Sequence, residues 1–592
     1  MTAYAKGFKT VFTELPFALC EPSMGKIPDD LEGTYFRAGP AMFSAGSIVP
    51  PKTSIVQPKQ PPVPDGQDPD RTVPHYFEGD GAVLGVTFSK ADQGETADRK
   101  VSARYRYIRT VAFTNERKKG QRIYNSMDST RQVDPASSAL GLGNDLPLPF
   151  FRHHLQPGLN KNRKNTSNTR AIYWGKRLLS LWEGGLPYKL DSLAVSTEGR
   201  SQLGGAIYRE TDSFGGKMVV DPKRNRALFH AVEQDPKKSS LLVYEFNSDF
   251  RLVKEEGGKV EVDVPGFAML HDFCATDNYA VFVQPDITVN GVKYVVSKKP
   301  GEVLDAGSGP AHVLLVPRPG SSRSMQRLSI PSSDNFSDAN LQFVNAFEDG
   351  DNVVFDAIRS DGSKVSSNSS PMKWPYVSTL DTYRSSVAKK SLWRYTVNTR
   401  SGEVSKRQLL NDHCFFGGVN PSYSTQKHRY IYLNVGGTGS EVAPLQGIAR
   451  YDTETDQTDV WMPQSHEFCG EPMYAAKMGT KDDKATEDSG YVMSVVFDGK
   501  RETSDLVILN ASDLKAGPIC RIPLGIAIPH GLFGCFTTAK EASWSADEIE
   551  RRSKLADKVE SRGNMWNEVK SDFSGLGLRF DDMEEYFGDF FS

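Results

Sequence analysis

The sequence predicts an all-β protein built from many short strands. Runs of β-branched and aromatic residues recur between about residues 171 and 536, and Asp, Asn, Gly or Ser bounds each run. Examples are AIYWGKRLLSLWEG (171–184), KMVVDPKRNRALFHAV (217–232) and RYIYLNV (429–435). The 51 glycines and 35 prolines suit a chain dense in turns. Such regular spacing over several hundred residues indicates a large barrel, an array of sandwiches or a propeller.

Composition sets further bounds on the class of protein. The 592 residues are 38% hydrophobic, enough for several domains or one large architecture. A net charge of −3 gives no basic surface, so nucleic acid is not an expected partner. Six scattered cysteines without a CxxC pair argue against a disulfide framework or a structural zinc site and fit a reducing compartment.

Hydropathy bears on the cellular location. No segment reaches about 18 consecutive apolar residues, the length that a membrane-spanning helix needs. The first residues also lack the apolar stretch of a secretory signal. We therefore expect a cytoplasmic protein, and a peripheral contact with membranes or lipid droplets stays open.

Two segments differ from the strand-rich body. Residues 45–74 are rich in proline and almost free of aromatic residues, which predicts a surface insertion. From about Thr537 a serine followed by charged residues at helical spacing predicts a helix. The chain then becomes acidic and aromatic in FSGLGLRFDDMEEYFGDFFS (573–592). This end is interpreted either as a solvated tail or as a docking motif.

Local catalytic motifs are missing from the sequence. It contains no glycine-rich phosphate loop, nucleophile elbow or HExxH helix. Its ten histidines are scattered, and no pair has the spacing of a local metal motif. A metal site built from them would need ligands from distant strands, as the axis of a propeller can supply. For most of them an ordinary hydrogen-bonded strand or loop histidine is the simpler interpretation.

Several motifs along the chain resemble those of the carotenoid cleavage oxygenases, the retinal pigment epithelium membrane protein type. They cover about residues 10–536, and the N-terminal third is most similar to the fungal torulene-cleaving branch. The motifs are LEGTYFRAGP (31–40), HYFEGDGAV (75–83), KNTSNT (164–169), LLSLWEGGLPYKLD (178–191), MLHDFCATDNYAVF (269–282), FVNAFEDGDNVVFD (343–356), GEPMY (470–474) and EDSGYVMSVVFD (487–498).

The resemblance implies a seven-bladed β-propeller domain over residues 1–536, with helices and loops capping one face. A C-terminal helical and acidic-aromatic tail would occupy residues 537–592. It also implies a non-haem Fe(II) on the axis, held by four histidines and oriented by glutamates. Members of the family use O2 to cleave a double bond of a carotenoid, apocarotenoid or stilbene. Carotenoid or apocarotenoid and O2 are therefore the implied partners, and an apolar tunnel would admit the polyene.

Carried over residue by residue, the resemblance assigns four metal-ligand positions. The second ligand falls on His271 in MLHDF. The first falls on Lys217 in GKMVVDP, the third on Gln342 in LQFVNAFE, and the fourth on Phe533 in PHGLFGCF. His530, three residues before Phe533, is a candidate substitute ligand if the loop shifts its register.

The resemblance places ligand-orienting glutamates at three positions, and this sequence has glutamate at two of them. Glu183 in LWEGG and Glu471 in GEP match, whereas Phe415 stands at the third position. A lysine binds a metal only after losing its proton, a glutamine carbonyl is a weak ligand, and phenylalanine provides none. We also expect Lys217 to pair with Glu183 in place of a metal contact.

Two functions remain open from the sequence. One is oxidative cleavage of a torulene-like carotenoid or apocarotenoid with Fe(II) and O2. The alternative is a non-catalytic family member that binds a polyene, an apocarotenoid or a partner protein, because three of the four ligand positions lack histidine.

Overall fold

The structure is a computed structural model of the whole chain. It describes residues 1–44, 73, 76–89, 100–120, 122, 124, 164–183, 185–207, 213–235, 237–254, 257–289, 304–307, 309–331, 336–361, 379–436, 442–478, 486–541 and 544–561. The proline-rich segment at 45–74, except Val73, and the acidic-aromatic end lie outside these residues.

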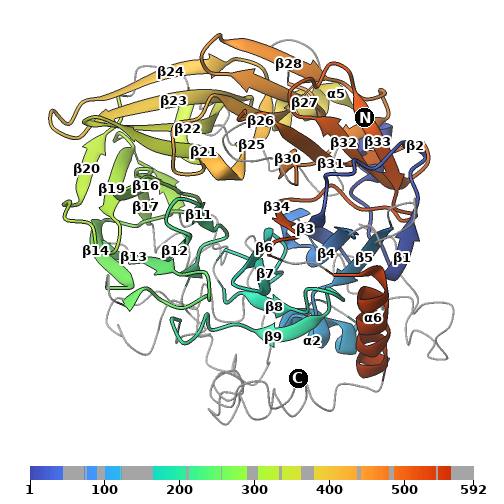
Figure 1. The fold of residues 1–592 in the computed structure, drawn as a ribbon. Helices are drawn as coiled ribbons and strands as arrows, with labels where there is room; N and C mark the ends of the chain where they lie inside the picture. The colour runs from blue at the N-terminus through green and yellow to red at the C-terminus, as the bar shows by residue number, and fades with distance from the viewer. Residues whose placement is uncertain are drawn as a thin grey trace.

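Seven antiparallel sheets of four or more strands surround a central axis in the described part of the chain (Figure 1). This confirms the predicted seven-bladed propeller. The first sheet is β1 (Leu15–Cys20), β5 (Val101–Tyr107), β4 (Asp80–Phe88), β3 (Gly33–Met42) and β34 (Gly534–Thr538). The second is β6 (Arg170–Trp174), β7 (Arg177–Leu181), β8 (Tyr188–Leu190) and β9 (Thr197–Arg200).

The next three blades follow in chain order. The third contains β10 (Ser213–Phe214), β11 (Val219–Asp221), β12 (Arg226–Glu233), β13 (Lys238–Phe246) and β14 (Lys259–Pro265). The fourth contains β15 (Cys274–Ala275), β16 (Tyr279–Gln284), β19 (His312–Pro317) and β20 (Gln326–Ser329). The fifth contains β21 (Phe336–Asp349), β22 (Asn352–Asp361), β23 (Lys390–Asn398) and β24 (Val404–Leu410). A separate hairpin pairs β17 (Ile287–Val289) with β18 (Leu304–Ala306).

Two more blades complete the ring. The sixth contains β25 (Cys414–Gly418), β26 (Tyr430–Gly436), β27 (Leu445–Asp452) and β28 (Gln457–Trp461). The seventh contains β2 (Met24–Gly25), β33 (Pro518–Pro523), β32 (Thr503–Asn510), β31 (Gly490–Asp498), β29 (Glu467–Cys469) and β30 (Met473–Ala476).

The ring is closed by strands from opposite ends of the chain. In the first sheet β34 pairs with β3, and in the seventh β2 pairs with β33 (Figure 1). Because both closures join distant segments, neither sheet is complete until the whole propeller has been assembled.

Short helices lie at the ends of the blades. They are α1 (Thr2–Lys6), η1 (Tyr76–Glu78), α2 (Val111–Lys119), α5 (Leu380–Ser386) and η5 (Pro421–Tyr423). Tyr4 of α1 lies 5.9 Å from Tyr383 of α5 between ring centroids, and Phe8 lies 5.1 Å from Tyr76 of η1. Aromatic packing therefore joins three separate segments into one covering layer.

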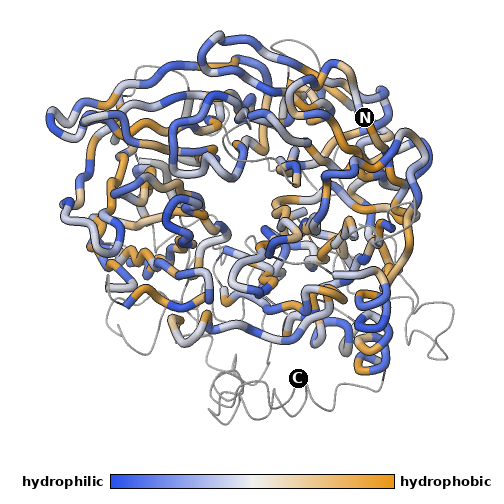
Figure 2. The backbone as a smooth tube through the Cα atoms, in the orientation of Figure 1, coloured by the Kyte–Doolittle hydropathy of each residue, from blue (hydrophilic) through white to orange (hydrophobic). Residues whose placement is uncertain are grey.

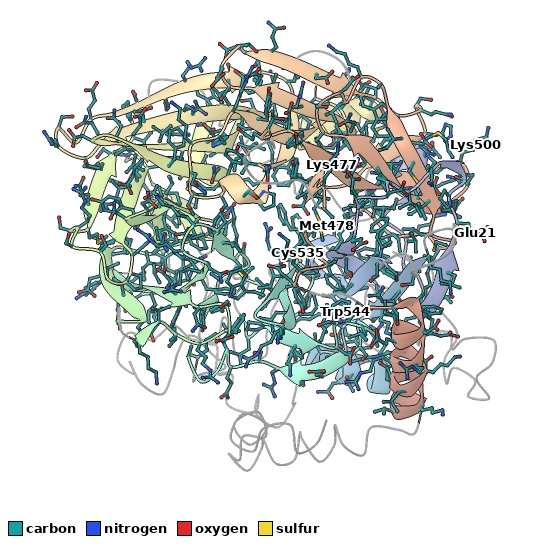
Figure 3. The ribbon with its side chains drawn as sticks, in the orientation of Figure 1. Glu21, Lys477, Met478, Lys500, Cys535 and Trp544 are labelled. Carbon is teal, nitrogen blue, oxygen red and sulfur yellow. The ribbon has the colours of Figure 1, made fainter. Side chains whose placement is uncertain are left out.

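The C-terminal helix α6 (Ala546–Ser561) is docked on the propeller. Ser545 and Glu548 form a reciprocal capping box, which confirms the serine start predicted from the sequence. Ile549 is fully buried, and the Arg106 side chain lies 2.7 Å from Asp557. Trp544, labelled just before the helix in Figure 3, contacts Tyr173 with ring centroids 5.9 Å apart.

The core consists of apolar layers between and within the blades. Figure 2 shows hydrophobic segments concentrated along the strands and hydrophilic turns at the outer rim. Both faces of most blades are buried, as the nine-residue β31 shows with every residue buried. Strands buried on two faces read as continuous apolar runs, which is why the sequence shows so few alternating patterns.

One buried ion cluster crosses between the third and fourth blades. The guanidinium of Arg318 lies 2.7 Å from Asp221 and 2.6 Å from Glu245, and all three side chains are at most 2% exposed. Arg318 also donates to the carbonyl of Thr276, at 2.9 Å. Charges buried this deeply stabilise the fold only as a complete set.

Replacing Arg318 with Met should lower the free energy of unfolding by roughly 3–5 kcal/mol, because two buried carboxylates lose their partner. Urea unfolding followed by tryptophan fluorescence measures the change. Lys238→Met is the control, since Lys238 and Asp263 form an exposed pair and the expected loss is below about 1 kcal/mol. Equal losses in both variants would contradict this account.

Candidate functional site

The four expected ligand positions lie at the inner edge of four different blades. Lys217 and His271 come just before β11 and β15, Gln342 lies in β21, and Phe533 comes just before β34. Figure 1 places β11, β21 and β34 beside the axis. The structure therefore brings together at the centre the strands that the resemblance selected.

Lys217 connects three blades by hydrogen bonds. Its ammonium lies 2.8 Å from Asp272 Oδ1 and donates to the carbonyl of Phe343, also at 2.8 Å. The second carboxylate oxygen of Asp272 accepts the backbone N–H of Phe343 at 2.9 Å. A closed cycle of charge-assisted bonds thus occupies the first ligand position. The expected pairing of Lys217 with Glu183 stays a prediction.

Gln342 and Phe533 are also engaged with the protein. Gln342 is 8% exposed, and its Oε1 accepts the backbone N–H of Phe416 at 3.0 Å. The ring of Phe533 packs edge-on against Phe416 with centroids 5.1 Å apart. The Arg170 guanidinium stacks over the Phe533 ring at 4.2 Å. The amide oxygen and the ring therefore both have protein partners.

The donor set does not suit iron. His271 alone supplies an imidazole, whereas Fe(II) sites in proteins combine several imidazole or carboxylate ligands. Within the described residues, no three His, Cys, Asp or Glu side chains are grouped so as to hold a metal ion. We therefore derive no chemical step from a metal at this axis.

The two matching glutamates have different surroundings. Glu471 accepts the backbone N–H of Gly534 at 2.7 Å, directly after Phe533. Burial raises the pKa of Glu471 to about 7, and nearby Arg170 opposes the rise. Glu183 approaches Gly216 closely: a Cβ on that glycine would lie 3.1 Å from Glu183 Cγ. The two glutamates therefore lie against segments next to the implied ligand positions, Glu471 beside Gly534 and Glu183 beside Gly216.

Phe415, at the third glutamate position, belongs to a wall of aromatic rings. Its centroid lies 4.7 Å from that of Phe416 and 6.4 Å from that of Phe533. Phe415 and Phe533 both remain partly exposed although they stand near the axis. An apolar surface replaces the polar one that the family pattern would place here.

The backbone around Phe533 fixes the register of its loop. Its N–H donates to the carbonyl of Thr169, and its own carbonyl accepts from Ala38 and Ala171, each at 3.1 Å. This segment is therefore held between β3 and β6 on both sides. The assignment of Phe533 to the fourth ligand position stays a prediction.

His530 is joined to the N-terminal helix. Its Nε2 donates to the carbonyl of Tyr4 at 3.0 Å, and its backbone N–H donates to Gly7. Its ring packs against Phe8 and Phe497 with centroids 4.7 and 5.4 Å away. Burial lowers the pKa of His530 to about 4, so the imidazole is neutral at physiological pH.

The fold agrees with the comparisons to known proteins. A model of the family described as retinal pigment epithelial membrane protein matches residues 8–538. The chain belongs to this family. It is 29% identical to the apocarotenoid-15,15'-oxygenase of Synechocystis sp., over 86% of this chain and 91% of that protein.

This chain also has relatives in a plant and a fungus. They include the carotenoid 9,10(9',10')-cleavage dioxygenase of Crocus sativus, 23% identical over 92% of this chain and 90% of that one. The resveratrol cleavage oxygenase 1 of Aspergillus fumigatus is 24% identical over 89% and 93%. The cobalt-substituted apocarotenoid oxygenase of Synechocystis superposes with a TM-score of 0.73 at 26% identity, covering 90% and 98%. These relatives share the carotenoid-cleavage family but do not specify torulene.

Sequence reasoning missed two charged groups at the axis. Asp272 directly follows the matched His271 in the HDF motif, and that adjacency was the available signal. Arg170 stacks on Phe533 across 363 positions of sequence, which no local pattern reveals. The buried His230 is bonded within the protein, since its Nε2 donates to the carbonyl of Leu270 at 2.9 Å.

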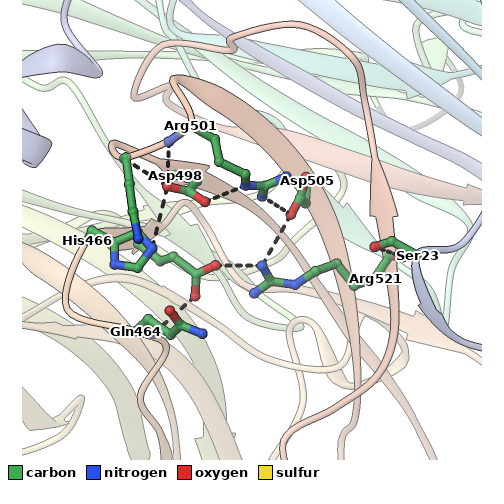
Figure 4. Close-up of a pocket in the computed structure, with 9 residues that line it drawn as sticks. Ser23, Gln464, His466, Asp498, Arg501, Asp505 and Arg521 are labelled. Atoms are coloured by element: carbon green, nitrogen blue, oxygen red, sulfur yellow. Dashed lines mark hydrogen bonds and ion pairs between the residues drawn. The ribbon is translucent and has the colours of Figure 1, made fainter.

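A polar pocket of about 400 Å³ lies on the seventh blade, among the ion pairs of β29, β31, β32 and β33 (Figure 4). Arg501 lies 2.5 Å from Asp505, and Arg521 lies 2.5 Å from Glu467. His466 lies 3.6 Å from Asp498. The acidic and basic groups that line this pocket pair with one another, so the pocket is an ionic network of the blade.

No helix in the described ranges is long and apolar enough to cross a membrane.

Lowering the pH should destabilise the fold, because the buried neutral imidazole of His530 must then take up a proton. Because its folded pKa of about 4 lies below the ordinary 6.5, stability is complete above pH 6.5 and falls as the pH drops toward 4. The loss should reach at most about 1.4 kcal/mol per pH unit from this residue. His530→Gln keeps a donor for Tyr4 but does not titrate, so its unfolding free energy should fall less steeply with pH. The partly exposed His466, replaced by Gln, is the control, and an unchanged slope in His530→Gln would refute the assignment.

Proposed function

We propose that this protein binds a carotenoid or apocarotenoid polyene at the propeller axis without cleaving it. The observation that carries the proposal is the state of the ligand positions. Lys217 bonds Asp272, Gln342 bonds the Phe416 backbone, and Phe533 presents a ring. These three side chains are stabilised by contacts within the protein and not by a bound metal ion.

Aromatic side chains near the axis support a polyene as the ligand. Phe415, Phe416 and Phe533 form contiguous rings, and two of them keep exposed surface. A flat conjugated chain can bury its apolar surface against such rings at about 25 cal/mol per Å². The names of the relatives add that carotenoids and apocarotenoids are handled by this family. Since such ligands partition into lipid, we also propose peripheral contact of a cytoplasmic protein with membranes or lipid droplets.

Oxidative cleavage of a torulene-like carotenoid is the second candidate. It is favoured by the retention of His271, Glu183 and Glu471 and by the oxygenases among the relatives. It would require Fe(II) and O2, with other groups completing the ligand set. His530 is the candidate substitute, but its imidazole is hydrogen-bonded to Tyr4. Iron content therefore separates the two functions.

Protein purified without oxygen and supplied with ferrous iron should retain less than about a tenth of an iron per chain, measured by mass spectrometry of the metal. Restoring histidine together at Lys217, Gln342 and Phe533 should raise the content toward one, because four imidazoles would then meet at the axis. The matched control restores histidine at Phe533 alone. Near-stoichiometric iron in the unaltered protein would contradict the proposal.

A polyene mixed with the protein should acquire a shifted absorption spectrum that persists in air. Phe533→Ala should weaken binding roughly 10–100-fold, because a buried phenylalanine ring contributes about 1.5–3 kcal/mol. Quenching of tryptophan fluorescence measures the affinity. Phe77→Ala is the control, since Phe77 is 53% exposed on η1. Bleaching that depends on O2 would instead support the oxygenase.

A further inference from the structure

Lys390 places a primary amine against the aromatic wall of the axis. It is the first residue of β23, in the fifth blade, and its Nζ lies 4.0 Å from the centroid of the Phe415 ring. Phe415 lies on β25, in the next blade. The amine is therefore in the seam between two blades, on the side where Phe415 leads to Phe533.

Among the described residues, no carboxylate forms an ion pair with Lys390. Its backbone N–H donates to His413 Nδ1 at 3.1 Å. The residue opposite Lys390 on the neighbouring strand β22 is the uncharged Ser360. A partly buried lysine is often paired with an acid, because an ammonium taken out of water without a partner is costly. Here the face of one aromatic ring is the partner shown.

Two titratable neighbours of Lys390, Cys414 and His413, are uncharged near neutral pH. Burial raises the pKa of the Cys414 thiol and lowers the pKa of His413 to about 3. The nearby Lys389, whose Nζ bonds Asn411, is a further cation. Burial lowers the pKa of Lys390 to about 8, and the nearby Cys414 thiol opposes this shift.

A continuous series of aromatic rings joins the axis to this amine. Phe533, Phe416 and Phe415 follow one another at centroid distances of 5.1 and 4.7 Å, and Lys390 lies over the last of them. A Cβ added at Gly418, on the same strand as Phe415, would meet nothing within 4 Å. There is open space on this strand, and Lys390 itself is partly exposed.

We propose that Lys390 captures a polyene aldehyde as an imine, with the apolar chain lying along Phe415, Phe416 and Phe533. The inference rests on the proposed polyene site and specifies its ligand class. The neutral amine attacks the aldehyde carbon, a carbon–nitrogen double bond forms, and the carbonyl oxygen leaves as water. No oxidant, reductant or metal is consumed.

An aldehyde fits this amine better than a carboxylate does. An amine whose pKa is lowered to about 8 is neutral far more often at pH 7.4 than the amine of an ordinary lysine. A carboxylate ligand would pair with the ammonium and would be favoured by a raised pKa instead. The wall of three rings suits a conjugated chain beside the reacting carbon.

Retinal, a polyene aldehyde, is incubated with the full chain and sodium cyanoborohydride, and the intact protein is weighed. The expected adduct has the mass of one aldehyde less one oxygen atom, and peptide mapping should place it on Lys390. Lys390→Arg keeps the positive charge but cannot form the imine, so trapping should fall at least tenfold. Lys389→Arg is the matched control and should trap normally. Trapping should rise between pH 7 and 9 as the amine loses its proton.

Binding of retinol, the alcohol of the same chain length, separates this inference from the proposed function. Retinol bound at the axis with no aldehyde trapped on Lys390 would overturn the imine and leave the polyene site in place. Trapping that is equal in Lys390→Arg would also overturn it. If neither retinol nor retinal binds, the proposed function fails, and the inference fails with it.

Discussion

The bridge from Lys217 to Asp272 and Phe343 is the interaction on which the centre of this propeller depends. A propeller brings the inner strands of its blades together at one axis, and polar groups there need partners from neighbouring blades. In this chain the ammonium of Lys217 bonds two blades at once, and Asp272 completes the cycle. Three blades are thereby joined by two side chains and the backbone of Phe343.

The remaining axial groups are arranged around that solution. Gln342 holds the backbone of Phe416, which brings this ring to Phe533. Glu471 binds the N–H of Gly534 and so supports the same loop from the other side. Each of these positions has a protein partner of matching chemistry. Asp272 pairs with the Lys217 amine, the Phe416 N–H donates to the Gln342 amide oxygen, and the Phe416 ring packs on Phe533.

The fold could be predicted from the sequence because its signals are local and repeated. Short β-branched runs between turn residues identify a ring of sheets, and motifs such as LWEGG and NAFE select the propeller. Ser545, which caps α6, likewise predicts where this helix begins. These features depend on residues near one another in the chain, which a single sequence contains.

The contacts of the site could be predicted only in part. The resemblance selected the inner-strand positions of Lys217, Gln342 and Phe533, but it could not supply their partners. Asp272 lies 55 positions from Lys217, and Lys390 lies 25 positions from Phe415. Such pairs are set by the packing of one blade on the next. The role of His530 was uncertain for the same reason, since its partner Tyr4 is 526 residues away.

Departures from histidine at several of the implied ligand positions have a simple physical basis. A metal with four ligands loses most of its affinity when one is removed, so the others no longer gain from being imidazole. An unused imidazole at the axis would then require another partner or remain exposed. Lys217 and Phe533 avoid that cost by bonding and packing within the protein. Lys390, two blades away from Lys217, remains without a carboxylate among the described residues, and this makes its amine the reactive group beside the ring wall.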